Sequence, residues 1–354
     1  MKYGFLHKDF KLNSNSFSSQ EEVLSFTQID HKDIHKFLNR WFNESLFIYV
    51  YTSGSTGKPK QIQLKKEYMV NSALATGKYF DLPSKTSSLL CLPLEHIAGK
   101  MMMVRAMILG WEIDVVKPSS RPLMNLSKKY EFSAMVPLQL FNSLDEISMI
   151  KTLIVGGGEV SQALRSKIMD LPVKIYATYG MTETITHIAV KSLNKASGLN
   201  NNDNLYNALP NVSFKANLRN CLIIDALKVS EKQIVTNDIV EVVSDNKFKW
   251  LGRFDHIINT GGIKLIPEQI EEKLYQIIRQ RFFITSVPDE VLGEKVVLVV
   301  EGDVAKNLNS QILKLKSITK FEIPKEVYFI KQFLETETKK IQRQRTLDLI
   351  LLQS

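Results

Sequence analysis

The sequence predicts a layered α/β protein with a second, smaller domain, and three observations support this prediction. Short apolar runs typical of strands alternate with helical stretches through the first two thirds of the chain. Short β-like runs follow after residue 204, and the pattern changes again at a glycine turn near residue 253. A chain of 354 residues is long enough for about two domains.

The first part of the chain predicts the large layered domain. The predicted strands are 46–50, 88–92, 152–155 and 173–177, and the predicted helices include 66–79 and 97–109. After an asparagine-rich segment, the runs 221–225, 233–235 and 239–243 predict a β subdomain. We therefore expect mixed sheets in an N-terminal domain that spans residues 1–252.

The remaining residues, 253–354, predict a small α+β domain. The expected elements are a helix over 267–280, a strand over 295–301, a helix over 310–317 and a strand over 326–330. Pro267 suits the first turn of its helix, because its missing N–H costs no hydrogen bond there. About 100 residues suffice for a compact domain.

Composition and charge exclude several classes of protein. With 44% hydrophobic and 23% charged residues, no signal-like N-terminus and no unbroken apolar stretch, the chain is expected to be cytoplasmic, without a membrane partner. Cys91 and Cys221 match no metal spacing and are expected to be buried thiols. The net charge of +9 is spread along the chain, which favours solubility and attraction of small polyanions over nucleic-acid binding.

The most informative segment is 51–60, with the sequence YTSGSTGKPK behind an apolar run. Glycines let backbone N–H groups approach anionic oxygens, hydroxyls add donors, and lysine supplies positive charge. The segment is not a Walker A loop, because its glycines lie three apart and Pro59 follows Lys58. Read alone, it also fits an ordinary surface turn. The candidate phosphate-binding residues are Thr52, Ser53, Gly54, Ser55, Thr56, Gly57 and Lys60.

This decapeptide resembles the phosphate-binding signature of the acyl-adenylate-forming (AMP-binding) superfamily, which includes the acyl-CoA synthetases. The resemblance covers about residues 46–345 and implies that ATP, Mg²⁺ and coenzyme A are used. It also implies an acyl-CoA synthetase-like fold with a mobile C-terminal domain. Typical relatives carry a longer segment before the phosphate loop, so we expect a version of the fold that is truncated at the N-terminus.

The glycine-rich turn after residue 155 matches the superfamily's adenine-binding turn. By this resemblance, Gly157, Gly158 and Glu159 lie along the adenine ring. Without the resemblance, such a turn serves equally well for tight packing between a strand and a helix.

The run Tyr179–Thr184 resembles the superfamily's aromatic-Gly-x-Thr-Glu motif. The resemblance implies that Tyr179 stacks on adenine beside the permissive Gly180, and that Thr182 contacts the α-phosphate. Glu183 would then help to hold Mg²⁺, which prefers carboxylate oxygen. The alternative is a turn capped by Thr182 or Thr184.

Asp238 and Arg253 match the superfamily's ribose-binding positions, although Asn237 replaces the usual glycine. Asn tolerates a positive φ better than most residues, so this change is acceptable. The resemblance further implies that Asp255 is the hinge of the C-terminal domain. Gly261 and Gly262 would give a backbone slim enough to line a thiol channel.

The segment 334–343 lies over the superfamily's catalytic-lysine motif, and Lys340 takes the place of that lysine. Leu334, Glu335 and Lys339 replace a proline, a lysine and a glycine of the pattern, so Lys339 is a rival candidate. Without the resemblance, this segment is a solvated charged tail.

The acid-binding side is expected near His96, within a Pro-Leu-x-His-Ile-x-Gly run, and near Arg105 in the apolar helix that follows. A buried guanidinium requires a partner. The hypothesis is a substrate carboxylate, and the alternatives are a structural ion pair or an arginine whose head group reaches the surface.

The sequence therefore predicts an ATP-dependent acid–CoA ligase that forms an acyl-adenylate and then a thioester. Its shortness and the run around His96 resemble the o-succinylbenzoate–CoA ligases of menaquinone synthesis, whose substrate carries two carboxylates. Two alternatives remain open. One is a different acid or a carrier-protein acceptor, and the other is a nucleotide-binding regulator without catalysis, which the altered 334–340 segment favours.

Overall fold

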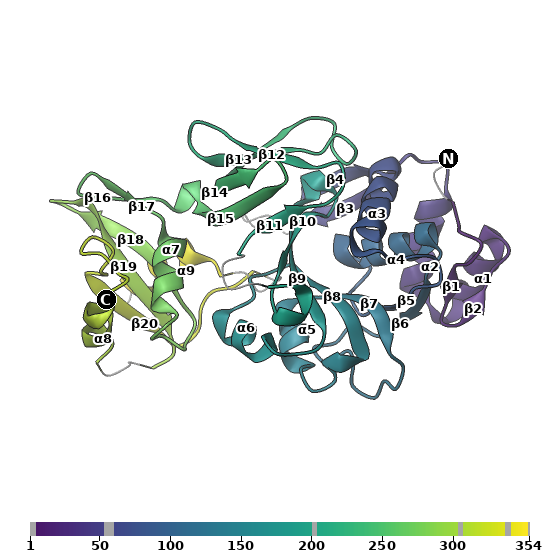
Figure 1. The fold of residues 1–354 in the computed structure, drawn as a ribbon, viewed down its shortest axis with the longest axis horizontal. Coiled ribbons are helices and arrows are strands. Elements are labelled where there is room, and N and C mark those ends of the chain that lie inside the picture. Colours follow the sequence, from purple (N-terminus) through teal and green to yellow (C-terminus); the bar gives the residue numbers. More distant parts are fainter. Residues whose placement is uncertain (1–4, 53–59, 200–203, 304–306, 337–340, 353–354) are drawn as a thin grey trace. The chain divides into compact units, whose positions relative to one another are not determined.

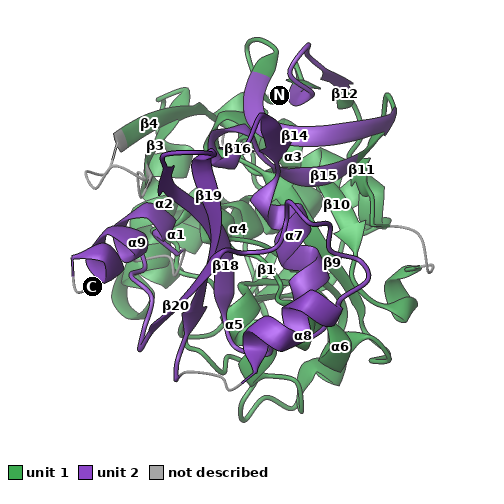
Figure 2. Ribbon diagram, turned by 90° about the vertical axis from the view of Figure 1, so that its left-hand side faces the viewer, with its two compact units in different colours: residues 1–214, 224–234, 244–248 green, residues 215–223, 235–243, 249–354 purple. Residues whose placement is uncertain are grey.

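The computed structural model describes residues 5–52, 60–199, 204–303, 307–336 and 341–352. The chain forms two compact units (Figure 2): unit 1 contains residues 1–214, 224–234 and 244–248, and unit 2 contains 215–223, 235–243 and 249–354. The strands β12 (Ser213–Ala216), β13 (Cys221–Asp225), β14 (Ile234–Ser244) and β15 (Lys247–Arg253) each have residues in both units. The division at residue 253 stays a prediction.

Unit 1 contains a parallel sheet in the order β9-β8-β7-β5-β6, extended by the antiparallel strands β10 and β11. Its helices and strands are β1 (Lys11–Leu12), β2 (Asn15–Ser16), α1 (Gln20–Asp30), α2 (Lys32–Phe42), β3 (Phe47–Thr52), β4 (Lys60–Lys65), α3 (Lys66–Phe80), β5 (Ser87–Leu90), α4 (Ile97–Leu109), β6 (Glu112–Val115), β7 (Tyr130–Met135), α5 (Pro137–Asn142), β8 (Ile150–Val155), α6 (Gln162–Ile168), β9 (Lys174–Gly180), β10 (His187–Ser192) and β11 (Tyr206–Ala208).

Successive residues of β9 show how helices cover both faces of this sheet (Figure 1). Ile175 packs into the cluster that includes Leu140 of α5 and Leu164 of α6. The next residue, Tyr176, contacts Phe80 at the end of α3, with ring centroids 5.2 Å apart. Because side chains alternate along a strand, α5 and α6 cover one face and α3 covers the other.

Helix α4 is buried on nearly all sides because it contacts α3 as well as β5, β6 and β7. Gly99 allows this fit, since a Cβ there would lie 2.2 Å from the carbonyl oxygen of Pro93. The helix ends at Gly110, which adopts the left-handed conformation with φ of 72°. The apolar run around residues 97–109 is therefore a core helix.

Unit 2 contains a sheet in the order β17-β16-β19-β18, with β20 parallel to β19. Helices α7 and α8 pack on one face through a cluster that includes Ile284 and Leu298, and α9 packs on the other through Phe283 and Val297. The elements are β16 (Ile258–Thr260), β17 (Ile263–Leu265), α7 (Pro267–Leu274), β18 (Phe282–Asp289), β19 (Gly293–Glu301), α8 (Leu308–Lys314), β20 (Glu326–Ile330) and α9 (Arg343–Leu351).

The predicted α/β class is confirmed, and most predicted elements are present with changed limits, but the runs expected over 233–235 and 239–243 form one strand, β14. The helix expected over 267–280 ends at Leu274, and the helix expected over 310–317 is α8, which begins at Leu308. The strand expected over 46–50 is β3, which pairs with β4 in a separate two-stranded sheet. Strands β7 and β18 were not predicted.

Candidate active site

The glycine turn 156–159 follows β8 at its carboxyl end. Thr178 of the neighbouring β9 donates to the carbonyl of Val155 at 3.1 Å, and a Cβ on Gly156 would lie 2.4 Å from that hydroxyl. Gly157 has φ of 80°, a left-handed conformation that favours glycine. Gly158 and Glu159 are exposed. The turn thus places an open stretch of backbone at the edge of the sheet.

The Tyr179–Glu183 motif lies at the same sheet edge, because β8 and β9 are parallel and Val155 pairs with Ala177. One side of the Tyr179 ring is fixed by the rings of Tyr206 and Phe248, with centroids 5.5 Å and 5.1 Å away. The adenine-turn candidates and the Tyr179–Glu183 motif are therefore brought together.

Thr184, rather than Thr182, caps the turn after β9. Its hydroxyl accepts from the Met181 N–H at 3.0 Å and contacts the carbonyl oxygens of Met181 and Thr186. The side chains of Thr182 and Glu183 make no hydrogen bond to any described residue, and Glu183 is exposed. Both remain available to a ligand.

The phosphate-loop candidates Ser53, Gly54, Ser55, Thr56 and Gly57 lie outside the described residues. The flanking strands β3 and β4 pair in an antiparallel ladder whose last pair is Thr52 with Lys60. The predicted strand before residues 53–59 is thus present as β3, and it pairs with β4.

Arg105 is the largest buried cation of unit 1 and is 1% exposed. Its Nε donates to the hydroxyl of Thr76 at 3.2 Å, and its Nη2 lies 3.4 Å from Nδ1 of His187. No carboxylate of the described residues pairs with it. Burial lowers the pKa of Arg105 to about 9, so the guanidinium stays charged at neutral pH.

His187 is 5% exposed and was not predicted as a site residue. Because arginine only donates, Nδ1 of His187 accepts and the proton lies on Nε2, which is 3.5 Å from the Thr76 hydroxyl. Burial and the charge of Arg105 hold the pKa of His187 well below its usual value. In the β9–β10 ladder His187 pairs with Gly180, so Arg105 is linked to the edge that carries the Tyr179–Glu183 motif.

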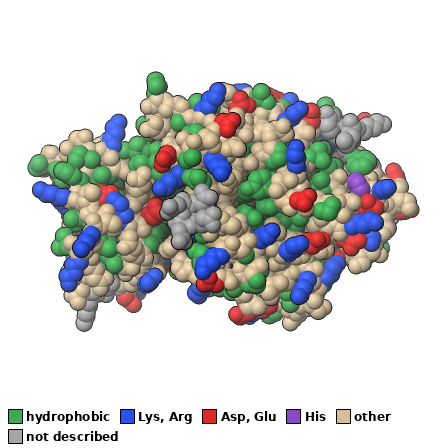
Figure 3. All heavy atoms as spheres, viewed as in Figure 1, with side chains coloured by type: hydrophobic (Ala, Val, Ile, Leu, Met, Phe, Trp, Pro, Cys, Tyr) green, Lys and Arg blue, Asp and Glu red, His purple; other side chains and the backbone are tan. Residues whose placement is uncertain are grey.

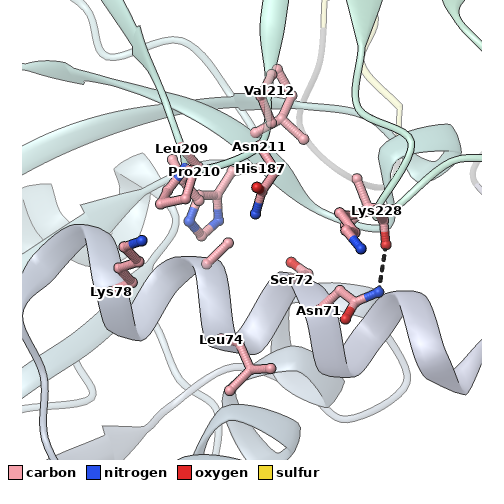
Figure 4. A pocket seen from close by; sticks show the side chains of 13 residues that line it. Asn71, Ser72, Leu74, Lys78, His187, Leu209, Pro210, Asn211, Val212 and Lys228 are labelled. Atoms are coloured by element: carbon pink, nitrogen blue, oxygen red, sulfur yellow. Dashed lines mark hydrogen bonds between the residues drawn. The ribbon is translucent and has the colours of Figure 1, made fainter.

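A small cleft lies over His187 (Figure 4). Its volume is about 180 Å³, and its walls come from α3 and from residues 209–212 and 228–229. Lys78 and Lys228 line it, and none of the described residues that line it carries a carboxylate. Asn71 closes one side by donating to the carbonyl of Lys228 at 2.8 Å.

His96 lies apart from Arg105. His96 is exposed and directly precedes α4. Arg105 lies nine residues later, within that helix. At 1.5 Å per residue this separation is about 13 Å along the axis. The structure therefore does not bring the two predicted acid-binding residues together.

The ribose and hinge candidates meet within unit 2. Arg253 donates to both oxygens of Asp255 at 2.9 Å and 3.0 Å, and its Nη1 lies 3.8 Å from Oδ1 of Asp238. Asp238 is 7% exposed and accepts from the indole N–H of Trp250 at 3.1 Å. The hydrogen bond from Arg253 lowers the pKa of Asp255.

Gly261 and Gly262 form the two-residue turn between β16 and β17, with φ values of 56° and 81°. Two successive positive φ values define the type of hairpin turn that favours glycine at both positions. The Gly261 N–H donates to the carbonyl of Leu292 at 2.9 Å, and a Cβ on Gly262 would meet nothing within 4 Å.

Lys340 and Lys339 lie outside the described residues, but the residues on either side of 337–340 are described. Glu335 and Ile341 form a β-bridge, and the Gln342 side chain donates to the carbonyl of Glu335 at 2.8 Å. Glu335 also forms an ion pair with Arg281.

The described residues contain no group of three or more metal-binding side chains. Glu183 as a single carboxylate still fits Mg²⁺, which binds through one or two carboxylates, water and substrate phosphates.

In the described part of the chain, every helix is too short or too polar to cross a bilayer. On the face drawn in Figure 3, Lys and Arg side chains are interspersed with acidic ones.

Residues 10–215 match the AMP-binding enzyme family. A solved structure named as an acyl-CoA synthetase (AMP-forming)/AMP-acid ligase II-like protein from Dyadobacter fermentans is 35% identical, covers 91% of this chain and 95% of that chain, and has a TM-score of 0.61. The 2-succinylbenzoate–CoA ligase of Staphylococcus aureus is 24% identical across 96% of this chain and 75% of its own length. O-succinylbenzoate CoA synthetase from Bacillus subtilis, solved with ATP and magnesium, is 17% identical, covers 93% of this chain and 82% of that chain, and has a TM-score of 0.71. These matches confirm the resemblance inferred from the motifs, and the chain belongs to the AMP-binding enzyme family.

Proposed function

We propose that this chain is an AMP-forming acid–CoA ligase and that its acid is 2-succinylbenzoate. Family membership and relatives with this name support the reaction class. The observation that supports the acid is Arg105, a buried cation with only neutral partners among the described residues.

The reaction has two steps. A carboxylate oxygen of the acid attacks the α-phosphorus of ATP, the bond to pyrophosphate breaks, and an acyl-adenylate forms. The thiol of coenzyme A then attacks the acyl carbon, releases AMP and loses its proton, which yields the thioester. Because both substrates of the first step are anions, catalysis depends on their positioning and on neutralisation of charge.

The proposed roles follow the motifs. Thr52 to Lys60 surround the β- and γ-phosphates, Gly157 to Glu159 and Tyr179 hold adenine, and Asp238 with Arg253 holds the ribose. Thr182 contacts the α-phosphate, and Lys340 bridges it to the carboxylate. A Mg²⁺ ion held by Glu183 would neutralise phosphate charge.

The predicted domain of residues 253–354 contributes different residues to the two steps, one after the other. Lys340 serves adenylation and the Gly261–Gly262 turn serves the thiol, so we propose that this domain rotates about Asp255 between the steps. The left-handed glycine turn, without a side chain to obstruct the thiol, is consistent with this role.

The two alternatives for Arg105 are disfavoured by its surroundings. A structural ion pair would require a carboxylate, and none of the described residues supplies one. An arginine that reaches the surface would expose its head group, whereas Arg105 is 1% exposed. A charged guanidinium in this position is well suited to receive the second carboxylate of a dicarboxylic acid.

The test is pyrophosphate release with ATP, Mg²⁺ and a panel of acids, measured with and without coenzyme A. We expect release with 2-succinylbenzoate, weak release with benzoate, which lacks a second carboxylate, and thioester only when coenzyme A is present. Equal rates with both acids would contradict the assignment of the acid, and no release with any acid would contradict an acid–CoA ligase.

A further inference from the structure

Arg343, at the start of α9, makes two parallel contacts with one carboxylate. Its Nη1 lies 2.8 Å from Oε1 of Glu271, and its Nη2 donates to Oε2 at 2.9 Å. Nη1 also lies 3.7 Å from Oε1 of Glu268. Both glutamates belong to α7, so Arg343 fixes the beginning of α9 to α7.

Glu271 is buried and its two oxygens are satisfied. It is 5% exposed, and Oε1 also accepts from the backbone N–H of Ile284 at 2.7 Å. Removing the positive partner of a buried carboxylate strongly destabilises the folded state, so we expect the contact between Arg343 and Glu271 to persist.

Glu268 continues the contacts toward the predicted hinge. Its Oε1 lies 2.5 Å from Nδ1 of His256, the residue after Asp255. A Cβ on Gly252 would lie 2.4 Å from the other oxygen of Glu268, so the backbone before the hinge packs directly against this carboxylate. One chain of polar contacts thus runs from His256 through Glu268 to Arg343.

We infer that Arg343 is a positioning residue for adenylation: it fixes the beginning of α9 to α7 and, through Glu268, to the predicted hinge. Arg343 lies three residues after Lys340, and the described residues between them, Ile341 and Gln342, are tied to Glu335 and Leu334. This role rests on the proposed function, in which Lys340 serves the first step only.

The test compares the two half-reactions of Arg343→Met. Adenylation should fall by roughly 10²-fold, because a small misplacement of a catalytic group has this effect. Thioester formation from supplied acyl-AMP and coenzyme A should be unchanged, which also shows that the unit carrying Gly261 and Gly262 is folded. Arg343→Lys should recover part of the adenylation rate, since lysine restores the charge but not the paired contact. Arg279→Met, at an exposed arginine of the same unit, is the matched control.

Equal loss of both half-reactions, or no loss of adenylation, would overturn the positioning role. Glu271→Gln repeats the test from the other side of the contact while it keeps the side-chain shape. The variant Lys340→Ala distinguishes a failure of this inference from a failure of the proposed function. Adenylation that survives Lys340→Ala contradicts the lysine assignment, whereas adenylation that survives Arg343→Met but not Lys340→Ala contradicts only the role of Arg343.

Discussion

Arg105 in unit 1 is buried and Arg343 in unit 2 is partly exposed, and they have opposite partners. Arg343 contacts two carboxylates, Glu268 and Glu271. Arg105 contacts a hydroxyl and a neutral imidazole and has no carboxylate among the described residues. A cation paired with carboxylates serves as a structural element, whereas a buried cation without such a partner is disfavoured unless a ligand brings the missing charge. The comparison therefore supports different proposed roles for the two residues: Arg343 positions a segment, and Arg105 binds the substrate.

The largest expected effect concerns the residue that Arg343 is proposed to position. Lys340→Ala should lower acyl-adenylate formation by roughly 10²–10³-fold, the usual effect of removing one preorganised donor. Thioester formation from supplied acyl-AMP should persist. Pyrophosphate release and thioester formation, measured separately, check this outcome, and equal loss in both assays would refute the division of labour.

Glu271, the buried partner of Arg343, predicts that the stability of the protein depends on pH. Burial raises the pKa of Glu271 to about 7 despite the charge of Arg343, so the folded state binds more protons than the unfolded state between pH 4.5 and 7. Stability should therefore fall as the pH rises through this window, by roughly 3 kcal/mol. Urea unfolding at several pH values checks the slope.

Glu271→Gln serves as the control for the pH prediction, because its side chain does not titrate. Its stability should vary less over the same window than that of the unaltered protein. An identical slope in both proteins would show that other groups are responsible.

The proposed contact between Arg105 and the acid predicts that substitution of Arg105 weakens substrate binding. Arg105→Met should raise the KM for 2-succinylbenzoate about 10- to 100-fold, which corresponds to loss of a charged hydrogen bond of about 1.5–3 kcal/mol. The KM for ATP should be unchanged. Arg121→Met, at an exposed arginine of the same unit, is the control. An unchanged KM for the acid in Arg105→Met would remove the substrate role.

The sequence predicts the fold class correctly, and it also predicts that the two glycine-containing motifs follow strands, because both depend on short segments. The turn at Gly157 and the run from Tyr179 to Glu183 each follow a strand that is recognisable from its own residues. The parallel pairing of β8 and β9 then brings both motifs to one sheet edge.

Contacts between distant segments were not predictable from local patterns. His187 lies 82 residues after Arg105, and Arg343 lies 72 residues after Glu271. The apolar pattern around Arg105 correctly indicates burial, but it carries no information about the partner. The missed residue is His187, and its position four residues after Glu183 was the one available signal for it. Nothing in the nearby sequence identifies it as the neighbour of an arginine.

The smallest expected effect separates the two arginines most directly. Arg105→Met should change the free energy of unfolding by less than about 1 kcal/mol, because loss of the hydrogen bonds to Thr76 and His187 is offset by removal of a buried, unpaired charge. Arg343→Met should destabilise its unit more, since it leaves Glu271 buried without its partner. Urea unfolding midpoints of the two variants check this contrast. If Arg105→Met destabilised the protein as much as Arg343→Met, Arg105 would be a structural arginine, and the free charge that supports a dicarboxylic substrate would be absent.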